Sequence, residues 1–459
     1  MALTETKNTL STERPSGPEV EQFVSVAETI KPTLALKGTG TPGVVIIGGG
    51  FAGMNAAKGL ADAPVKVTLI DRRNHHLFAP LLYQVATAQL SPANIAQPIR
   101  GILRGQKNVS VVLGDVDGID VDGKSVNLSD GSAIDYEYLI VAVGATHSYF
   151  GHDEWAPLAP GLKTIEDALD IRRRILIAFE KAAREKDPAR RDAQLSFIVI
   201  GGGPTGVELA GAIGEIANHS LANDFDTIDP RKARILLLEG LPRILPMFAE
   251  KLSTRAEQDL KRFGVETRTN SLVTAIDENG VNIGDERIEA NTVIWAAGVQ
   301  VSPLTHALSE IATLDRAGRV PVERELHVAG HPEIFVIGDA SSARNAEGKP
   351  LPGVAPVAMQ EGQWVAANIV RATNGEPYRP FAYKDRGSMA TIGRNQAVAE
   401  IRGFQFAGFP AWLAWALIHV FFMVDLRNRV LVIAQWIFSY LTFNRGARLI
   451  TGELTVKKD

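Results

Sequence analysis

Two stretches of the chain share one pattern of apolar, glycine-rich and helical positions. At residues 44–60 (VVIIGGGFAGMNAAKGL), an apolar run leads into a glycine-rich turn and an Ala-rich helix, and an apolar run ending in an acid follows at 65–73. The same order returns at 195–217 (LSFIVIGGGPTGVELAGAIGEIA) and 234–240 (RILLLEG). A buried strand, a helix and a second buried strand make a βαβ unit. We therefore predict two copies of a nucleotide-binding unit.

Later apolar strands complete each copy and set the expected domain boundaries. YLIVAVGA (138–145) follows the first copy, NTVIWAAGV (291–299) follows the second, and EIFVIGDA (333–340) comes later still. We predict an α/β fold with two Rossmann-like dinucleotide-binding domains and a C-terminal helical region that associates with a membrane. The expected divisions are a disordered or loosely attached polar arm at 1–42, a discontinuous first domain at 43–162 and 300–390, a second domain at 163–299, and the C-terminal region at 391–459.

Each copy carries the glycine pattern GxGxxG between its strand and its helix. The first glycine allows a tight turn, the second lets the backbone approach a pyrophosphate, and the third allows close helix packing. The helix N-terminus then offers free N–H groups to phosphates. The acid that ends the next strand, Asp71 or Glu239, is placed to accept from ribose hydroxyl groups. The glycines are Gly48, Gly50 and Gly53 in the first copy, and Gly201, Gly203 and Gly206 in the second.

The acid of the second copy also bears on the choice between NADH and NADPH. A carboxylate at Glu239 would repel a 2′-phosphate, which favours NADH, although Arg243 nearby could weaken that preference. Glu239 lies farther along the chain than the usual spacing of about 20 residues. We expect residues 218–233 to form the intervening helix end and loop.

The composition excludes several kinds of chemistry. The chain has 459 residues, no cysteine and a net charge of -4. The absence of cysteine rules out disulfides, thiolate nucleophiles and thiolate metal sites, and the acidic balance argues against nucleic-acid binding. His75 and His76 have no acid pattern around them, so we expect a polar loop and no metal site. Arg172, Arg173 and Arg174 are interpreted as one solvated helix face.

Two short apolar helices are expected near the end of the chain. FPAWLAWALIHVFFMV begins at Phe409, with Pro410 suited to a first helical turn, and predicts a helix over 410–424. At 1.5 Å per residue such a helix is roughly 21 Å long, which is short of the hydrocarbon core of about 30 Å. A second helix is expected over 430–443.

The polar residues of this region favour a hairpin that lies on a membrane surface. The second helix carries a polar stripe, the two helices contain Trp412, Trp415 and Trp436, and arginines flank them. A buried core or dimer hairpin and a transmembrane hairpin are the alternatives. The stripe is Gln435, Ser439 and Thr442, and the basic flanks are Arg427, Arg429, Arg445 and Arg448.

Three further stretches carry a family resemblance. These are NHHLFAPLLYQVATAQLSPANIAQPIR (74–100), VAPVAMQEGQWVAANI (354–369) and GSMATIGRNQAVAE (387–400). Together with the duplicated units, they resemble the type II NADH:quinone oxidoreductases, which are flavoproteins with two dinucleotide-binding domains. The resemblance covers the chain from about residue 43 onward. Without cysteine, the chain cannot be a disulfide reductase or a sulfide:quinone reductase of the same superfamily.

The resemblance implies a function. Non-covalent FAD would occupy the first domain and NADH the second, and electrons would pass from NADH through FAD to a membrane quinone without proton pumping. The protein would be peripheral on the cytoplasmic face of the cell membrane, and its apolar tail is also compatible with a homodimer. The alternatives are a soluble NADH-dependent flavoprotein reductase of a protein acceptor and an NADH-sensing flavoprotein.

The resemblance also assigns residues. Glu208 would be an acid near the nicotinamide and Gln360 a quinone ligand, and both would be catalytic. The residues implied beside the flavin ring are Pro80, Leu82, Tyr83, Gln84 and Thr87. The implied FAD residues are Gly48, Gly50, Phe51, Ala52, Gly53, Asp71, Arg72, Thr87, Val116, Ala142, Gly144, Gly338, Asp339 and Ala355. The implied NADH residues are Gly201, Gly203, Pro204, Thr205, Gly206, Glu208, Glu239, Ala297 and Gly298, and the implied quinone residues are Tyr83, Ala358 and Gln360.

Simpler roles remain open for five of these residues. Glu208 could interact only with the dipole of its helix, and Gln360 could be an ordinary residue near a helix N-terminus. Asp339 could be a turn or cap residue, and Leu82 and Tyr83 could belong to the core.

Overall fold

The first domain is built on a six-stranded sheet. The computed structural model describes residues 41–451, so the predicted arm at 1–42 lies almost entirely outside the described residues. The strand order is β19-β20-β9-β1-β2-β5, and all neighbouring strands are parallel except β19 and β20. The strands are β1 (Gly43–Ile47), β2 (Lys66–Asp71), β5 (Val109–Leu113), β9 (Tyr138–Val141), β19 (His327–Val328) and β20 (His331–Val336).

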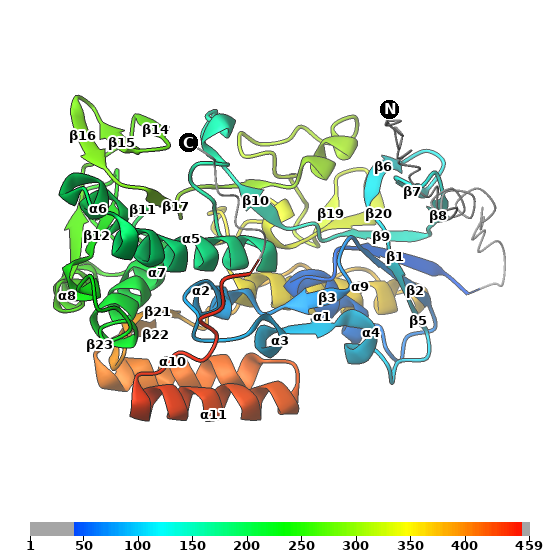
Figure 1. The fold of residues 1–459 in the computed structure, drawn as a ribbon. Helices are drawn as coiled ribbons and strands as arrows, with labels where there is room; N and C mark the ends of the chain where they lie inside the picture. Colours follow the sequence, from blue (N-terminus) through cyan, green and yellow to red (C-terminus); the bar gives the residue numbers. More distant parts are fainter. Residues whose placement is uncertain (1–40, 452–459) are drawn as a thin grey trace, which may run out of the picture.

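Two helices pack closely on this sheet and on each other. α1 (Phe51–Gly59) and α9 (Ala355–Thr373) touch where glycines leave no room for a side chain. A Cβ added to Gly362 would lie 2.2 Å from the backbone oxygen of Ala52, and one on Gly59 would lie 2.6 Å from the Cβ of Ala366. This contact brings the N-termini of both helices to the carboxyl end of β1 (Figure 1).

The second domain repeats the arrangement with four parallel strands in the order β13-β12-β11-β17. In both sheets, the strand that leads into the glycine turn (β1 or β11) is central. On one side lies the strand that leads to the acid (β2 or β12), and on the other a later apolar strand (β9 or β17). The predicted α/β fold with two dinucleotide-binding units is therefore confirmed. The elements are α5 (Ile165–Arg184), α6 (Pro188–Gln194), β11 (Ser196–Ile200), α7 (Pro204–Glu215), β12 (Arg234–Leu238), α8 (Glu250–Arg262), β13 (Val265–Arg268) and β17 (Thr292–Trp295), and α7 continues into a π-helical turn, Ile216–Ser220.

Smaller elements connect and cover these sheets. Residues of the 74–100 stretch form short pieces between the two domains: β3 (His75–Leu77), α2 (Leu82–Ala86), α3 (Pro92–Ile95), β4 (Ala96–Pro98) and α4 (Ile99–Ile102). The others are β6 (Val116–Asp120), β7 (Ser125–Leu128), β8 (Ala133–Asp135), β10 (Ala145–His147), β14 (Ala275–Asp277), β15 (Gly280–Ile283), β16 (Glu286–Glu289) and β18 (Val299–Val301). β10 pairs with β18 and so links the two domains.

The C-terminal region is a three-stranded antiparallel sheet followed by two helices. β21 (Ser388–Gly393), β22 (Gln396–Ile401) and β23 (Phe404–Ala407) precede α10 (Phe409–Phe422) and α11 (Leu426–Thr442). The two helices lie side by side along the lower edge of the molecule (Figure 1). Within residues 41–451, no helix is both long and apolar enough to cross a membrane.

The helix boundaries differ from those predicted. α10 ends two residues earlier than expected, and α11 begins four residues earlier. The second difference arises because the Asp425 carboxylate accepts from the backbone N–H of Arg427, which caps the helix there. Apart from Leu426, the apolar residues of this helix begin only at Val430. The apolar pattern of the sequence therefore does not reveal the cap.

Two surface interpretations are wrong. Arg172 is only 5% exposed, whereas Arg173 and Arg174 pair with Asp170, because consecutive helix residues point about 100° apart and cannot share one face. His76 is also buried, in β3 rather than in a polar loop, and its Nδ1 lies 2.9 Å from the Gly49 carbonyl oxygen.

Candidate active site

The glycines of the two GxGxxG turns have matching geometry. Gly48 and Gly201 have positive φ angles of 103° and 109°, and a Cβ on either would collide with the strand beside it. A Cβ on Gly53 would lie 1.9 Å from the oxygen of Gly48, and one on Gly206 would lie 1.8 Å from the oxygen of Gly201. The first and third glycines are therefore required by the turn itself. Gly50 and Gly203 meet nothing within 4 Å, which leaves the backbone open to a ligand.

The two acids hold these turns to the sheet. Asp71 accepts from the backbone N–H of Gly49 at 2.6 Å, and Glu239 accepts from that of Gly202 at the same distance. Each acid also accepts from a backbone N–H two residues further on, in Arg73 and Leu241 respectively. The carboxylates are thus fixed at the rim of each turn, where the dinucleotide-binding fold places the ribose.

A large cavity of about 610 Å³ opens in front of the first glycine turn. Both helix N-termini, of α1 and α9, face it, so it offers free N–H groups and a positive potential to a pyrophosphate. Its volume and the open backbone at Gly50 fit a dinucleotide such as FAD. Of the residues implied for FAD, all but two line it: Gly48, Gly50, Phe51, Ala52, Asp71, Arg72, Val116, Ala142, Gly144, Gly338, Asp339 and Ala355.

The two exceptions have other positions. Gly53 lies beneath the turn and acts through packing. Thr87 is buried beyond the end of α2, where its hydroxyl donates to the carbonyl oxygen of Tyr83 at 2.8 Å, and its own carbonyl oxygen accepts from Arg445 at 2.7 Å. The family resemblance alone could not distinguish residues that line the cavity from residues that lie behind its lining.

A buried acid supports the floor of the large cavity. Glu361 of α9 is 1% exposed, and it accepts from the backbone N–H of Gly338 at 2.5 Å, next to Asp339. Its second oxygen has no hydrogen-bond partner. Burial raises the pKa of Glu361 to about 8, and the neighbouring Asp339 adds to that rise. A pKa in this range favours the protonated, uncharged form of Glu361 at neutral pH.

This acid makes the stability of the protein depend on pH. The carboxyl of an unfolded chain has a pKa near about 4.3, so between that value and about 8 the folded state keeps a proton that the unfolded state releases. The free energy of unfolding should then fall as pH rises, and Glu361→Gln should remove this part of the slope. Between about pH 6 and pH 7, the free energy of unfolding of Glu361→Gln should rise by about 1 kcal/mol relative to that of the wild type. Thermal unfolding followed by tryptophan fluorescence measures this difference.

The exposed Glu347 provides the control for this measurement. Glu347→Gln changes the same chemical group outside the core and should leave the pH dependence as in the wild type. Parallel wild-type and Glu361→Gln curves would show that Glu361 is ionised in the folded protein.

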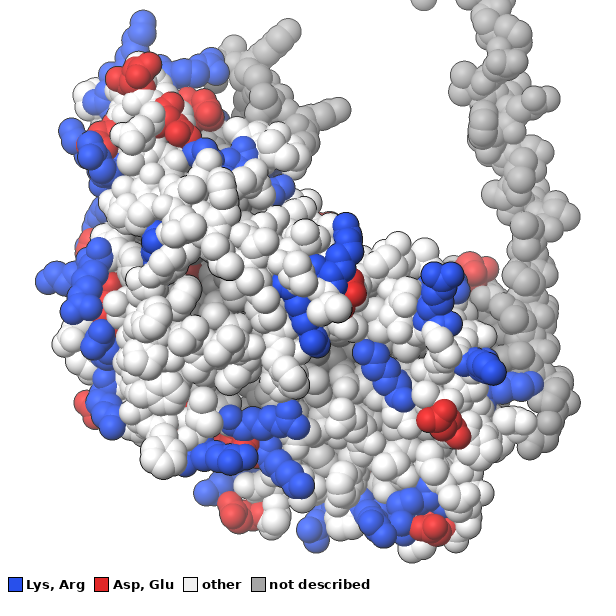
Figure 2. All heavy atoms as spheres, turned by 90° about the horizontal axis from the view of Figure 1, so that it is seen from below, with Lys and Arg blue, Asp and Glu red and all other residues white. Residues whose placement is uncertain are grey.

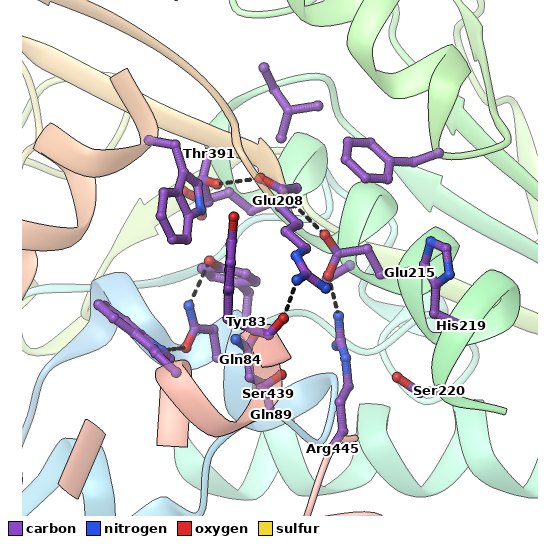
Figure 3. Close-up of a pocket in the computed structure, with 18 of the residues that line it drawn as sticks. Tyr83, Gln84, Gln89, Glu208, Glu215, His219, Ser220, Thr391, Ser439 and Arg445 are labelled. Carbon is purple, nitrogen blue, oxygen red and sulfur yellow. Dashed lines mark hydrogen bonds and ion pairs between the residues drawn. The ribbon is translucent and has the colours of Figure 1, made fainter. Parts of the chain in front are cut away.

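A small cavity of about 170 Å³ lies beside the large one, between α2, α7, β21 and the C-terminal helices. Tyr83, Gln84 and Glu208 face it together (Figure 3). The indole N–H of Trp436 donates to Gln84 Oε1 at 2.8 Å, which leaves Gln84 Nε2 to donate to the Tyr83 hydroxyl at 2.9 Å. Because the hydroxyl oxygen accepts there, its own hydrogen is free to donate to a ligand.

Glu208 is one of two acids that line this cavity, and Glu215 is the other. The side chain of Glu208 lines the cavity, and the backbone N–H of Thr391 donates to its carboxyl group (Figure 3). Burial raises the pKa of Glu208 well above its ordinary range, and this effect outweighs the opposing hydrogen bond. A protonated carboxyl at this position can donate a hydrogen bond or a proton to a ligand.

One ion pair closes the far side of the small cavity. Arg445 donates to Glu215 at 2.7 Å, and Glu215 also accepts from the backbone N–H of Arg394. Arg394 in turn stacks between the rings of Tyr440 and Phe443, at 4.1 and 3.9 Å from their centres. The interpretation of Arg445 as a basic flank at a membrane surface is wrong, because its side chain is buried and paired.

The residues implied for quinone do not lie together in the structure, and one of them shares a cavity with a residue implied for NADH. Tyr83 shares the small cavity with Glu208, which was assigned to NADH. Ala358 and Thr205 line the large cavity. Gln360 lines neither, and its amide group both donates to and accepts from the backbone of Lys384, at 3.0 Å each. The remaining NADH residues lie in the second glycine turn and the first turn of α7 (Gly201, Gly203, Pro204 and Gly206), directly after β12 (Glu239) or just after β17 (Ala297 and Gly298).

Comparison with known proteins places the chain in a family. Residues 42–362 match the model of the pyridine nucleotide-disulphide oxidoreductases, and residues 386–445 match the NDH2 C-terminal domain. The type II NADH:quinone oxidoreductase NdhA of Mycobacterium tuberculosis is 46% identical over 426 residues, which are 90% of this chain and 90% of that protein. The chain belongs to the type II NADH:quinone oxidoreductases. The predicted family is thereby confirmed.

Other type II NADH:quinone oxidoreductases support the same assignment. The enzyme of Staphylococcus haemolyticus is 32% identical over 379 residues, covering 80% of this chain and 92% of its own length. The structure of NDH2 from Plasmodium falciparum in complex with NADH has a TM-score of 0.80 and 21% identity, covering 90% of this chain and all of that chain, and it shows a common fold. With no cysteine, this type II oxidoreductase carries none of the disulfide chemistry in the broader family's name.

Proposed function

We propose that this type II NADH:quinone oxidoreductase uses its two cavities for the two halves of its reaction. FAD bound in the large cavity would supply the redox chemistry, accepting a hydride from NADH and returning two electrons to quinone. The small cavity would receive the quinone head group. The observation that carries this proposal is that two segments line both spaces. Ala79, Pro80 and Thr205 face the large cavity, and Tyr83, Gln84 and Glu208 face the small one.

The side chains of the small cavity suit the proton chemistry of quinone reduction. NADH, one proton and a quinone give NAD⁺ and a quinol, so each turnover takes up one proton. Burial raises the pKa of Glu208 and so favours its protonated form, which would donate a proton to a quinone oxygen. The Tyr83 hydroxyl, oriented by Gln84, would donate a hydrogen bond to the same head group. Gln360 contributes less to this proposal, because its amide is engaged by Lys384.

The reaction with a quinone analogue tests this proposal. Purified protein with bound FAD should oxidise NADH in the presence of the analogue alone, one quinol forming per NADH consumed. A preparation that needs an added protein acceptor, or that binds NADH without oxidising it, would support one of the two alternative functions. No feature of the two cavities favours either alternative.

The second glycine turn supports a preference for NADH. The carboxylate of Glu239 lies at the rim of the turn, where it would repel a 2′-phosphate. The guanidinium of Arg243 does not oppose it, because it donates to the carbonyl oxygens of Pro246 and Phe248 and to the hydroxyl of Ser253. Arg243 is thus held within its own loop.

Glu239→Gln should therefore relax the cofactor preference. An amide keeps an acceptor for Gly202 but removes the charge, so we expect the ratio of kcat/KM for NADPH to that for NADH to rise about tenfold, or about 1.4 kcal/mol. Steady-state rates with both nucleotides measure this ratio. Glu266→Gln, at an exposed acid in β13, is the control, and an unchanged ratio in Glu239→Gln would mean that another group selects the nucleotide.

The outer face of α10 and α11 is proposed to lie on the cytoplasmic surface of the cell membrane. Seen from below, the molecule shows a broad uncharged area that is bordered by basic side chains (Figure 2). The inner face packs on the protein through Trp415, Met423 and Val432. The exposed apolar side chains are Phe409, Leu413, Leu417, Ile418, Phe421, Leu426, Val430, Leu431, Ile433, Ile437, Phe438 and Leu441. An apolar face of this size, above a cavity for a lipid-soluble substrate, suits a lipid surface.

A further inference from the structure

The turn between α10 and α11 carries exposed apolar side chains, and three arginines lie in it or against it. Phe421 is 68% exposed and Leu426 is 72% exposed. The guanidinium carbon of Arg429 lies 5.9 Å from the ring centre of Phe421, and that of Arg386 lies 5.7 Å from the ring centre of Phe422. The third, Arg427, is exposed in the first turn of α11.

These arginines differ from those at the other end of α11. There, Arg445 pairs with Glu215 and Arg448 pairs with Asp224. Within residues 41–451, no carboxylate forms an ion pair with Arg386, Arg427 or Arg429.

The nearby acids have other hydrogen-bond partners. Asp425 caps α11 by accepting from the backbone N–H of Arg427, and Asp385 accepts from the backbone N–H of Gly387. Arg429 closes the turn by donating from Nε to the carbonyl oxygen of Met423 at 2.8 Å. That bond uses one of the five N–H groups of the guanidinium and leaves the others for a ligand.

We propose that the α10–α11 turn binds the phosphate of an anionic phospholipid headgroup. Guanidinium groups match phosphate oxygens in geometry and charge. Arg429 and Arg386 lie against the neighbouring rings of Phe421 and Phe422, whose centres are 5.5 Å apart, and Arg427 is exposed in the first turn of α11. The apolar tips of Phe421 and Leu426 would enter the acyl region beside that headgroup. This inference rests on the proposed lipid-facing role of α10 and α11, and it adds a headgroup preference that an apolar face alone would not have.

Vesicle binding by the full-length, FAD-loaded protein tests the inference. The two lipid compositions are phosphatidylcholine alone and phosphatidylcholine mixed with phosphatidylglycerol. We expect clearly tighter binding to the mixed vesicles at low salt, and we expect high salt to abolish the difference. Arg386→Gln combined with Arg427→Gln leaves the Arg429 bond to Met423 intact and should reduce the preference about 25-fold, at roughly fivefold for each charge near the surface.

A matched control separates local binding from net charge. Arg184→Gln combined with Arg190→Gln removes two exposed charges at the end of α5 and in α6, away from α10 and α11 (Figure 1), and should keep the preference. Equal binding of the wild type to both vesicles would overturn the headgroup site while leaving the lipid-facing role in place. Binding to neither vesicle would overturn that role itself. An equal loss in both double variants would show that charge acts without a local site.

Discussion

Glu208→Gln is expected to slow quinone reduction by about 100-fold, which is the scale of a lost general acid. Gln keeps the shape of the side chain and can still donate a hydrogen bond, but it cannot give up a proton. The half-reactions distinguish this effect from a loss of NADH binding. Rapid mixing with NADH alone should show an unchanged first half-reaction, and subsequent mixing with a quinone analogue should show the slow second half.

The pH dependence of this step provides a second signature. Burial holds the pKa of Glu208 above its ordinary range, so the protonated, donating form persists to higher pH than for an ordinary carboxyl. The rate of quinone reduction should fall as pH rises through that pKa, and the fall should be absent in Glu208→Gln. The pKa of Tyr83 is also raised by burial, and the Glu208 charge adds to that rise, so loss of the Tyr83 proton would affect the rate only at still higher pH.

The exposed Glu180 of α5 is the matched control, because Glu180→Gln removes a carboxylate outside both cavities. It should leave both half-reactions unchanged. If Glu208→Gln slows the NADH half-reaction and spares the quinone half, Glu208 acts beside the nicotinamide, as the family resemblance implied. If neither half changes, the carboxyl is structural.

Local sequence signals predicted the cofactor turns because the turns are themselves local. A residue with φ near that of Gly48, or packed as closely as Gly53, has to be glycine, so spacing alone reports the geometry. Asp71 and Glu239 were found in the same way, since each ends the strand next to its turn. Family resemblance then added residues of the large cavity, such as Gly338, which lie far away in sequence.

The small cavity could not be predicted in this way because distant segments form it. Glu215 and Arg445 meet across 230 residues, and Gln84 and Trp436 across 352. An arginine after an apolar helix has the same sequence pattern whether it faces headgroups or a buried carboxylate. Only the fold shows that Arg445 does the second, while Arg427 at the other end of α11 stays exposed.

The difference between buried and exposed side chains of the C-terminal region determines how membrane attachment should be tested. Deleting the chain from about residue 405 would remove the buried side chains of Trp415 and Arg445 together with the exposed apolar face, so it would confuse loss of attachment with loss of the small cavity. Substitutions confined to the outer face avoid this. Leu417→Glu, Ile437→Glu and Leu441→Glu change three side chains that are each more than half exposed.

We expect this triple variant to leave the membrane fraction. Each apolar side chain contributes about 1–2 kcal/mol when it enters lipid, and a carboxylate opposes entry, so the partition into vesicles should fall at least about 1000-fold. Vesicle sedimentation measures the partition, and NADH oxidation with a water-soluble quinone analogue should remain because the small cavity is intact. Leu272→Glu, at a side chain that is 71% exposed in the second domain, is the control. Unchanged sedimentation of the triple variant would mean that α10 and α11 do not hold the protein to lipid.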